Sequence, residues 1–596
     1  MSFRQGFSCY AARGLFYCLV LLMAGCSQEE RPKLVRTVYP LPQDVEIAPD
    51  APGQYGGRMI DVNSGEPSTL NPLVSEDASS SGMIAMLSTG LTRYDPVQEK
   101  VVPGLAKSWE IGADQKTFTF HLRRGLRWSD GAPLTAEDVL FTFQCIYDKR
   151  YATRAAYDLS VDGKPFEVRK IDDVTIEVCT PEIYAPLLLM IGGLEILPKH
   201  KLEQAYKDGT LMKQWTISTA QKTPHEIVST GAFCIHSYRP GERAVFTPNP
   251  HYYRADAKGQ RLPYIDYYIV QFVKDQNAST IAFATGRTDL EGLAPDQVAW
   301  VDRGARTYHF SIHDRGPSTA SNFIWFNQNP GKNKDGKPFV APHKLKWFTD
   351  VRFRQAISYG IDRQGIVDGV LFGRGAPLWG PESPANRKWY NPQVRQYPYD
   401  PKKAEALLAE AGFAKGADGV LRDSAGNAVE FSLITNQENP LRQNMATVFM
   451  ENMKALGIGV RLQFQDFGTF VGKVQDSYDY EAGLLGLTGG NDPVGGMSVY
   501  MSSGRLHQWH PCQTSPATTW EARIDALMLA QLKTLDESKR REYYNQVQEI
   551  MSEQLPFIYL VTPNAYGGLK NRWQNLNIPT QGSMLWNFDV IWTEAP

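Results

Sequence analysis

Hydrophobic and polar positions follow two different periods along the chain, and each period predicts a different element. In "KTFTFHL" (116–122), Phe118, Phe120 and Leu122 alternate with polar residues, which predicts a half-buried strand. In "DVRFRQAISYGI" (350–361), the apolar residues have helical spacing. Because both periods recur irregularly, we expect an α/β (mixed α+β) fold with several layers.

Three further segments have the pattern of amphipathic helices. "DPKKAEALLAEAGF" begins with Asp400 as N-cap and Pro401 at the first helical position, and Gly412 ends it. The segments 520–532, "WEARIDALMLAQL", and 541–556, "REYYNQVQEIMSEQLP", complete the set.

Two adjacent acids in "LRWSDGAPLTAEDVLFTF" (126–143) raise the question of a catalytic pair. Thr135 is a good N-cap, and Asp138 stands three residues later, close to a capping box. Glu137 and Asp138 fall in the first turn, where the helix dipole favours negative charge. Neighbouring helical residues point about 100° apart. These acids are therefore predicted to start a helix and not to flank a substrate.

The N-terminus has the pattern of an export signal. An apolar run at 15–25 follows basic residues and is too short to cross a bilayer as a mature helix. It ends in "LMAGC", which resembles the bacterial lipobox and implies acylation of Cys26. We expect a signal peptide over 1–25 and a proline-rich tether over 26–57. The mature protein would be exported to the periplasm or cell surface and anchored there by lipid chains, such as palmitate.

Charge and cysteine content exclude several classes of protein. The net charge of -2 over 596 residues gives no electrostatic basis for binding nucleic acid. Outside the leader the cysteines are Cys145, Cys179, Cys234 and Cys512, and no C-x-x-C occurs, so a structural zinc cluster is not expected. Cys179 and Cys234 lie in strand-like runs and are the first pair to expect as a disulfide.

The motifs of common enzymes are missing. Neither G-x-S-x-G nor H-E-x-x-H occurs. "GKNKDGKP" (331–338) nearly fits a phosphate loop, but Pro338 stands where Ser or Thr would reach magnesium. We interpret it as a polar surface loop, and we expect neither catalysis nor a cofactor.

One motif carries a family resemblance. The family pattern W-x-D-G-x-P-x-T-A-x-D-V is matched by Trp128, Asp130, Gly131, Pro133, Thr135, Ala136, Asp138 and Val139. "VVPGLAKSWE" and "STGAFCIHSYRPGERAVFTPNPHYY" match neighbouring family segments. The chain thus resembles the family 5 extracellular solute-binding proteins, the dipeptide- and oligopeptide-binding lipoproteins of ABC importers. The resemblance covers nearly the whole mature chain.

This resemblance implies the two-lobe fold of type II periplasmic binding proteins, with lobes that close on a ligand. The implied divisions are lobe I at 58–315 with an extra subdomain at about 79–225, lobe II at 316–560, and a return to lobe I at 561–596.

The resemblance also implies a function. The protein would capture short peptides as a monomer and deliver them to permease subunits driven by a cytoplasmic ATPase. A non-peptide solute, such as a nickel chelate, haem, a sugar or an opine, is one alternative. A sensing receptor without a transport role is another.

Ligand contacts are expected in a Gly-rich stretch of lobe II, "LGLTGGNDPVGGMSVY". In the resembling proteins an acid there holds the peptide's α-ammonium, which implies this role for Asp492 beside Asn491. Gly489 replaces an acid found in some relatives, and an Asn-Asp-Pro turn without ligand is the alternative. Further candidates are Thr69, Asn71, Glu76 and Asp77 near the N-terminus, then Arg374, Trp379 and Glu382, and finally Trp586.

A metal site is the remaining alternative. "HQWHPC" places His507, His510 and Cys512 at spacings that can chelate a soft divalent ion. An isolated cluster in a loop is more often incidental.

Overall fold

The computed structural model describes residues 34–151, 153–161 and 163–594. The predicted signal peptide at 1–25 and the predicted acylation site, Cys26, lie outside the described residues.

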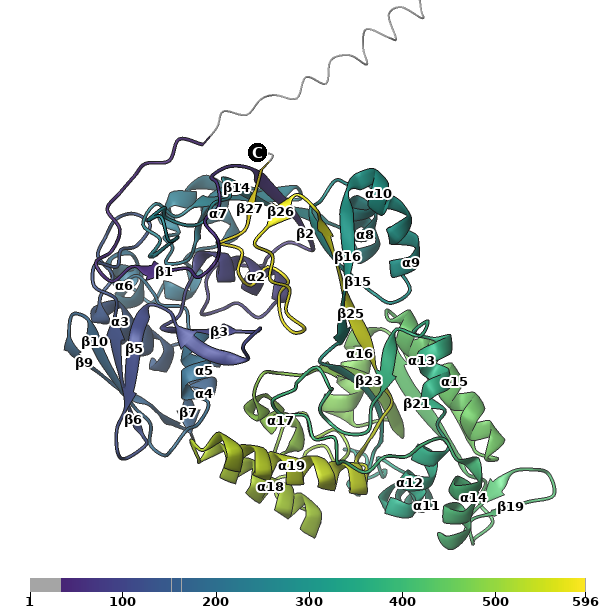
Figure 1. Ribbon diagram of the computed structural model, residues 1–596. Helices are drawn as coiled ribbons and strands as arrows, with labels where there is room; N and C mark the ends of the chain where they lie inside the picture. The colour runs from purple at the N-terminus through teal and green to yellow at the C-terminus, as the bar shows by residue number, and fades with distance from the viewer. Residues whose placement is uncertain (1–33, 152, 162, 595–596) are drawn as a thin grey trace, which may run out of the picture. The chain divides into compact units, whose positions relative to one another are not determined.

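Two four-stranded sheets organise the first part of lobe I (Figure 1). The first has the order β11-β12-β14-β2, with β2 at Arg58–Ser64, β11 at Phe233–Arg239, β12 at Arg243–Pro248 and β14 at Tyr267–Val273. The second has the order β5-β6-β10-β9, with β5 at Ala106–Ile111, β6 at Thr117–Leu122, β9 at Glu167–Asp172 and β10 at Thr175–Cys179. Helices α2 (Ala78–Leu87), α3 (Ala136–Tyr147), α5 (Leu187–Gly192) and α6 (Lys199–Lys207) accompany them.

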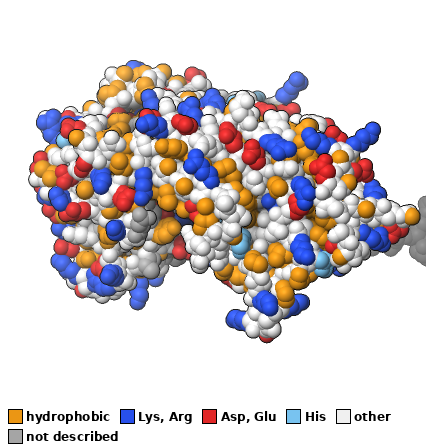
Figure 2. Space-filling model, turned by 90° about the horizontal axis from the view of Figure 1, so that it is seen from below, with side chains coloured by type: hydrophobic (Ala, Val, Ile, Leu, Met, Phe, Trp, Pro, Cys, Tyr) orange, Lys and Arg blue, Asp and Glu red, His pale blue; other side chains and the backbone are white. Residues whose placement is uncertain are grey.

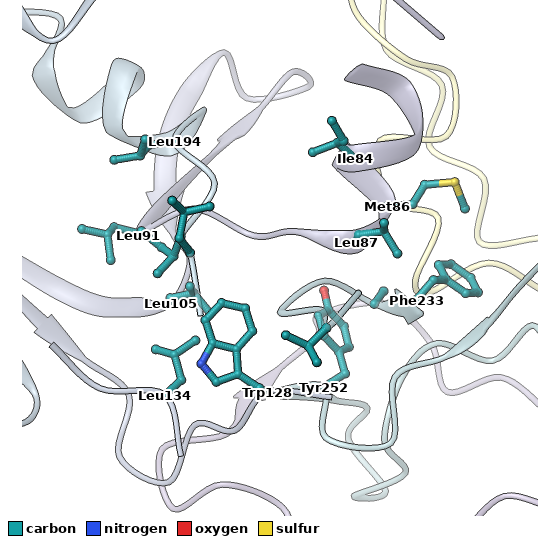
Figure 3. Close-up of a cluster of buried hydrophobic side chains, with 14 of the residues drawn as sticks. Ile84, Met86, Leu87, Leu91, Leu105, Trp128, Leu134, Leu194, Phe233 and Tyr252 are labelled. Atoms are coloured by element: carbon teal, nitrogen blue, oxygen red, sulfur yellow. The ribbon is translucent and has the colours of Figure 1, made fainter. Parts of the chain in front are cut away.

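The strand predicted at 116–122 is confirmed as β6. Phe118, Phe120 and Leu122 are each at most 1% exposed, whereas the residues between them are partly exposed. Their side chains belong to a large core that also holds Trp128 of the family motif and Leu134 (Figure 3). A period of two thus placed one face of the strand in this core.

The two adjacent acids of the family motif start α3, as predicted. Thr135 is the N-cap, and a capping box with Asp138 is complete. Asp138 Oδ1 also accepts a hydrogen bond from the Lys199 amide at 2.9 Å, and Glu137 pairs with Lys170 and Lys199 at 2.9 and 3.1 Å. Both carboxylates are occupied by structural partners.

Lobe II is a three-layer structure around a five-stranded sheet. The order is β22-β21-β23-β17-β24, with β17 at Ala320–Phe326, β21 at Glu430–Asn436, β22 at Gly459–Gln465, β23 at Ala482–Thr488 and β24 at Phe557–Tyr559. Within β17, Ile324 and Phe326 enter one core, while Phe323 and Trp325 enter another on the opposite face. Both faces of the sheet are therefore covered, as its nearly continuous apolar strands require.

Helices cover these two faces. The first core includes side chains from α11 (Pro342–Thr349), α12 (Val351–Tyr359), α13 (Arg363–Gly369), α14 (Pro401–Glu410) and α15 (Pro440–Ala455). The second includes side chains from α16 (Phe467–Gly472), α17 (Met497–Tyr500), α18 (Thr519–Leu532) and α19 (Glu537–Gln554). All four helices predicted from periodicity are present. The predicted start of α19, residue 541, is wrong, because Asp536 caps the helix and it begins at Glu537.

The chain crosses between the two parts twice at neighbouring positions. It leaves β16 (Phe310–Pro317) and enters β17, and later leaves β24 and enters β25 (Val561–Lys570). Strand β25 pairs with β15 (Leu290–Leu293) and β16, which lie beside it in Figure 1. It also pairs with the short β18 (Gly375–Pro377). The predicted boundary 560/561 lies between β24 and β25, whereas 315/316 falls inside β16, shortly before the first crossing.

The predicted disulfide between Cys179 and Cys234 is wrong. Both thiols are free. Cys179 ends β10 and Cys234 lies in β11, and these strands belong to different sheets. The sequence around each cysteine predicted a strand, but it could not predict which sheet that strand joins.

The predicted tether at 26–57 is too long. Strand β1 (Glu46–Ile47) pairs with β13 (Arg254–Ala255), and Ala48 is 3% exposed. Asp44 binds Lys107 and Arg124 at 2.9 and 3.1 Å. Proline content was misleading here, because the acids of this segment meet arginines that lie far away in the sequence.

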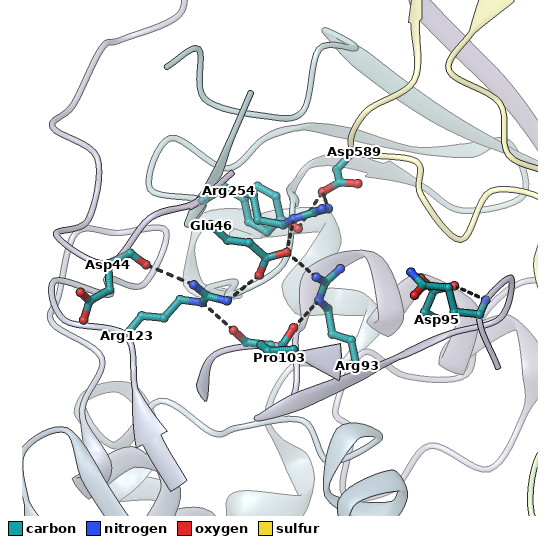
Figure 4. Close-up of polar contacts among 11 residues, drawn as sticks. Asp44, Glu46, Arg93, Asp95, Pro103, Arg123, Arg254 and Asp589 are labelled. Carbon is teal, nitrogen blue, oxygen red and sulfur yellow. Dashed lines mark hydrogen bonds and ion pairs between the residues drawn. The ribbon is translucent and has the colours of Figure 1, made fainter. Parts of the chain in front are cut away.

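Glu46 is the centre of a network of charged groups (Figure 4). Its carboxylate lies 2.5 Å from Arg93, 2.6 Å from Arg123 and 3.0 Å from Arg254. Arg254 also pairs with Asp589 near the C-terminus. The network joins the N-terminal segment, two arginines that lie before and after β5, and the C-terminal segment. The side chains of Arg123, Arg254 and Asp589 are each at most 8% exposed.

We expect Glu46→Gln to lower the free energy of unfolding by about 3 kcal/mol, because it leaves three arginines with too little negative charge. Urea denaturation followed by tryptophan fluorescence measures this loss. Glu110→Gln is the matched control, since the Glu110 side chain is 77% exposed and only borders His121. Equal stability of the two variants would contradict a central role for Glu46.

Candidate ligand-binding site

The Gly-rich segment of lobe II carries Asp492, the acid expected to meet a ligand ammonium. Asp492 forms a bidentate ion pair with Arg540 of α19, with N–O distances of 2.9 and 2.7 Å. Both side chains are 8% exposed. Asp492 Oδ1 also accepts from the Val494 amide at 3.0 Å. The chain itself therefore supplies a cation to this carboxylate.

Aromatic stacking holds the ion pair in place. The Arg540 guanidinium lies 5.0 Å from the ring centre of Trp389, and Trp389 Nε1 donates to the Asn491 carbonyl at 3.0 Å. Arg540 Nε donates to the Gln531 carbonyl at 3.0 Å. The Asn491-Asp492 turn is thus fixed to α18, α19 and the loop before α14.

A second acid, Glu382, lies beside the same segment. Tyr544 donates its hydroxyl to Glu382 Oε1 at 2.6 Å, and Asn386 Nδ2 donates to Glu382 Oε2 at 2.8 Å. Asn386 also donates to the Gly490 carbonyl at 3.1 Å. Loss of hydration raises the pKa of Glu382, the two hydrogen bonds oppose this rise, and the charge of Asp492 adds to it.

The N-terminal candidates mostly have structural partners. Asn71 is buried and donates to the Leu211 and Gln214 carbonyls, and Thr69 accepts from the Asn71 amide. Asp77 is the N-cap of α2. Burial by itself would raise the pKa of Asp77, but hydrogen bonds from Ser68 and Ser80 outweigh it and lower this pKa to about 2. Of these four residues only Glu76 is exposed.

The remaining candidates lie near the crossings or in the C-terminal segment. Arg374 is partly exposed, donates to the Phe372 carbonyl at 3.4 Å and has no ion pair among the described residues. The Trp379 ring lies 4.7 Å from the Arg363 guanidinium and packs against the lobe II core. Trp586 donates Nε1 to the Asn577 carbonyl at 2.7 Å. Arg374 is the one of these three that keeps a free polar group for a ligand.

The structure does not assemble the predicted metal alternative. His507 is 1% exposed and lies between the Val499 carbonyl and Glu521, at 3.2 and 3.4 Å. Cys512 is exposed, and its Sγ lies 2.6 Å from the Tyr478 hydroxyl. In the part of the chain that the structure describes, no group of three His, Cys, Asp or Glu side chains could hold a metal ion. His510 is therefore not part of such a group either.

Glu521 explains why His507 is buried. Burial favours the neutral acid, but hydrogen bonds from His507, Trp509 and Thr518 lower the pKa of Glu521 to about 2. The carboxylate therefore stays charged and holds the loop against α18. This histidine serves packing and hydrogen bonding.

Segments of lobe I and lobe II contact each other. The Ala185 amide donates to the Leu532 carbonyl at 2.9 Å, and Lys533 lies 2.6 Å from Glu182. Arg387 of lobe II pairs with Glu99 of lobe I at 3.0 Å. Leu532 enters the lobe I core, where Val494 and Met497 of the Gly-rich region also pack. The candidate segment therefore lies at the junction of the lobes.

Arg540 and Tyr544 are site residues that the sequence analysis missed. They stand four residues apart in α19, so they share one helix face, and both are buried. Extending the amphipathic pattern upstream of residue 541 would have placed an arginine on the buried face. A buried arginine requires an acid, and this was the available signal.

We expect Asp492→Ala to cost about 3–5 kcal/mol in the free energy of unfolding, because it leaves Arg540 buried without its carboxylate. The double variant Asp492→Ala/Arg540→Met should lose less free energy of unfolding. A double-mutant cycle based on urea denaturation then gives the coupling energy between the two side chains. Glu405→Ala, which breaks the exposed pair with Lys415, is the control and should cost less than about 1 kcal/mol. An equally small loss in Asp492→Ala would refute the structural role of the pair.

One face of the molecule carries charged side chains of both signs. On the face shown in Figure 2, Lys and Arg side chains are interspersed with Asp and Glu. Within the described residues, no helix has the length and apolar character needed to cross a membrane.

Comparison with known proteins identifies the family. The model of the bacterial extracellular solute-binding proteins, family 5 (middle), matches residues 100–507. A probable ABC transporter-binding protein of Deinococcus radiodurans is 31% identical over 87% of this chain and 89% of its own length. Di/tripeptide-binding protein 1 of Pseudomonas aeruginosa is 25% identical over 86% of this chain and 90% of its own length.

A solved structure confirms the predicted fold class. The oligopeptide-binding protein AppA of Bacillus subtilis, determined in complex with a nonapeptide, superposes with a TM-score of 0.67 at 24% identity, covering 91% of this chain and 99% of that one. The fold is the mixed α/β, two-lobe fold of type II periplasmic binding proteins. The family model and the long alignment together show that this chain belongs to the family 5 bacterial extracellular solute-binding proteins.

Proposed function

We propose that the protein is the lipid-anchored receptor of an ABC importer, which captures short peptides between its lobes and delivers them to a membrane permease. The observation that carries this proposal is the alignment of nearly the whole chain with relatives named for di- and tripeptide binding. The protein binds its solute and does not transform it, as is typical of this family.

Lobe closure is supported by the position of the two crossings. A hinge needs only a few residues that absorb the change in backbone angles, and both passages here are short and adjacent. The contacts between the lobes include an exposed ion pair, Lys533 with Glu182, and such pairs contribute little stability each. Weak contacts of this kind suit a clamp that must open again after ligand delivery.

The Gly-rich segment around Asn491 forms the lobe II wall of the proposed site. Its backbone is held by the Asp492–Arg540 pair, so its carbonyl and amide groups keep one geometry. Backbone hydrogen bonds to a peptide's main chain are independent of its side chains. Arg374 is available for a ligand carboxylate.

Identification of bound solutes tests the peptide proposal. A soluble form that starts after Cys26 is purified from the periplasm without added ligand and mildly denatured, and the released small molecules are analysed by mass spectrometry. A mixture of short peptides is the expected result. A single sugar, opine, haem or nickel complex would refute peptide capture while leaving the family and the transport role intact.

Anchoring through Cys26 has a separate test. Cys26→Ser should move the protein from the membrane fraction to the soluble periplasmic fraction, because acylation requires the thiol. Cys9→Ser, which changes another leader cysteine, is the control and should stay with the membrane. Membrane association of both variants would contradict the lipid anchor.

A further inference from the structure

Glu382 is a carboxylate without a cation. It lies in the loop that follows β18 and keeps part of its surface open. Its two oxygens accept from Tyr544 and Asn386, which are both neutral donors. Within the described residues, no Lys, Arg or His forms an ion pair with it. Neutral hydrogen bonds orient the carboxylate but leave its negative charge uncompensated.

A buried hydroxyl without a partner in the described part of the chain lies in the second core of lobe II. Tyr559 of β24 is 2% exposed, and its hydroxyl has no hydrogen-bond partner among the described residues. Burial, with Tyr500 and Glu382 nearby, raises the pKa of Tyr559 well above its ordinary value. Buried hydroxyl groups nearly always have a partner, so Tyr559 is a second polar group of lobe II whose hydrogen-bonding capacity is unused among the described residues.

The contrast with Asp492 is direct. Asp492 and Glu382 border the same segment, since Asn386 bridges Glu382 and the Gly490 carbonyl. Arg540 already neutralises Asp492 through two hydrogen bonds. A ligand cation would therefore gain little from Asp492 and much more from Glu382.

The position of Glu382 suits a ligand held between the lobes. The next residue, Ser383, donates its hydroxyl to the Ser318 carbonyl at the first crossing. Gln581 of the C-terminal segment donates to the Ala385 carbonyl. The loop that carries Glu382 is thus fastened to the hinge, to the C-terminal return into lobe I and to the Gly-rich segment.

We infer that Glu382 is the residue that binds the cationic group of the ligand, with the Asp492–Arg540 pair as a rigid support beside it. The inference rests on the proposed peptide function, under which this group is the α-ammonium of the peptide. The N–H groups of the ammonium would complete the acceptor capacity of the Glu382 carboxylate, which is partly exposed.

Calorimetric titration tests this inference with alanine peptides of two to five residues and with the same peptides acetylated at the N-terminus. Acetylation removes the positive charge and keeps the backbone. We expect the wild-type chain to bind the free peptides at least tenfold more tightly than the acetylated ones. Glu382→Gln should reduce this ratio to below threefold, and Glu382→Asp should restore part of it.

Two controls separate binding from folding. Glu430→Gln changes an exposed acid of lobe II and should leave the ratio at its wild-type value. Thermal melts show whether each variant is folded, and Glu382→Asp keeps the charge if Glu382→Gln does not fold. In that case the ratio of affinities for free and acetylated peptides is compared between Glu382→Asp and the wild type. A lower ratio in Glu382→Asp supports the inference, and a ratio equal to that of the wild type overturns it.

The outcomes distinguish the two proposals. If Glu382→Gln retains the full wild-type ratio, Glu382 does not bind the ammonium, while peptide capture stands. If the wild-type chain binds none of the free peptides, peptide capture itself is refuted and the role of Glu382 is refuted with it. If Asp492→Asn abolishes the ratio and Glu382→Gln does not, the ammonium belongs to Asp492.

Discussion

The carbonyl of Ser318 is the point on which the arrangement of the two lobes depends. It accepts hydrogen bonds from Ser383 and, at 3.0 Å, from Thr562, while the Ser318 amide donates to the Pro563 carbonyl at 2.9 Å. One residue thus connects the first crossing, the second crossing and the loop that carries Glu382. Because both passages of the chain are tied together here, the proposed closure of the lobes would pivot at this place, and the loop that carries Glu382 would be held at the pivot.

Three acids in this protein show how partners decide what a carboxylate does. Glu46 meets three arginines and joins distant segments of the chain. Asp492 meets one arginine in a bidentate pair and fixes a turn. Glu382 meets only neutral donors and so keeps a charge that a ligand can use. Burial alone would not separate these roles; the number of neighbouring cations does.

The elements with strong local signals were predictable. The strand at 116–122 and the helices that begin after Thr135 and Asp400 all follow from periodicity and capping, because these signals act within a few residues. The segment before residue 58 was misjudged for the opposite reason. Its prolines and charges looked like a tether, but the pairing of β1 with β13 and the ion pairs of Glu46 with Arg123 and Arg254 draw it into the fold.

The sequence by itself determined the family, the fold class and the helices and strands with clear periods, because these depend on local patterns and on a motif of contiguous residues. Only the tertiary structure decided the roles of the candidate site residues. Asp492 and Arg540 are 48 residues apart, and Glu382 and Tyr544 are 162 apart. Whether an acid near a ligand is neutralised depends on such long-range pairs, which the packing of helices and loops creates and which no local pattern of residues encodes.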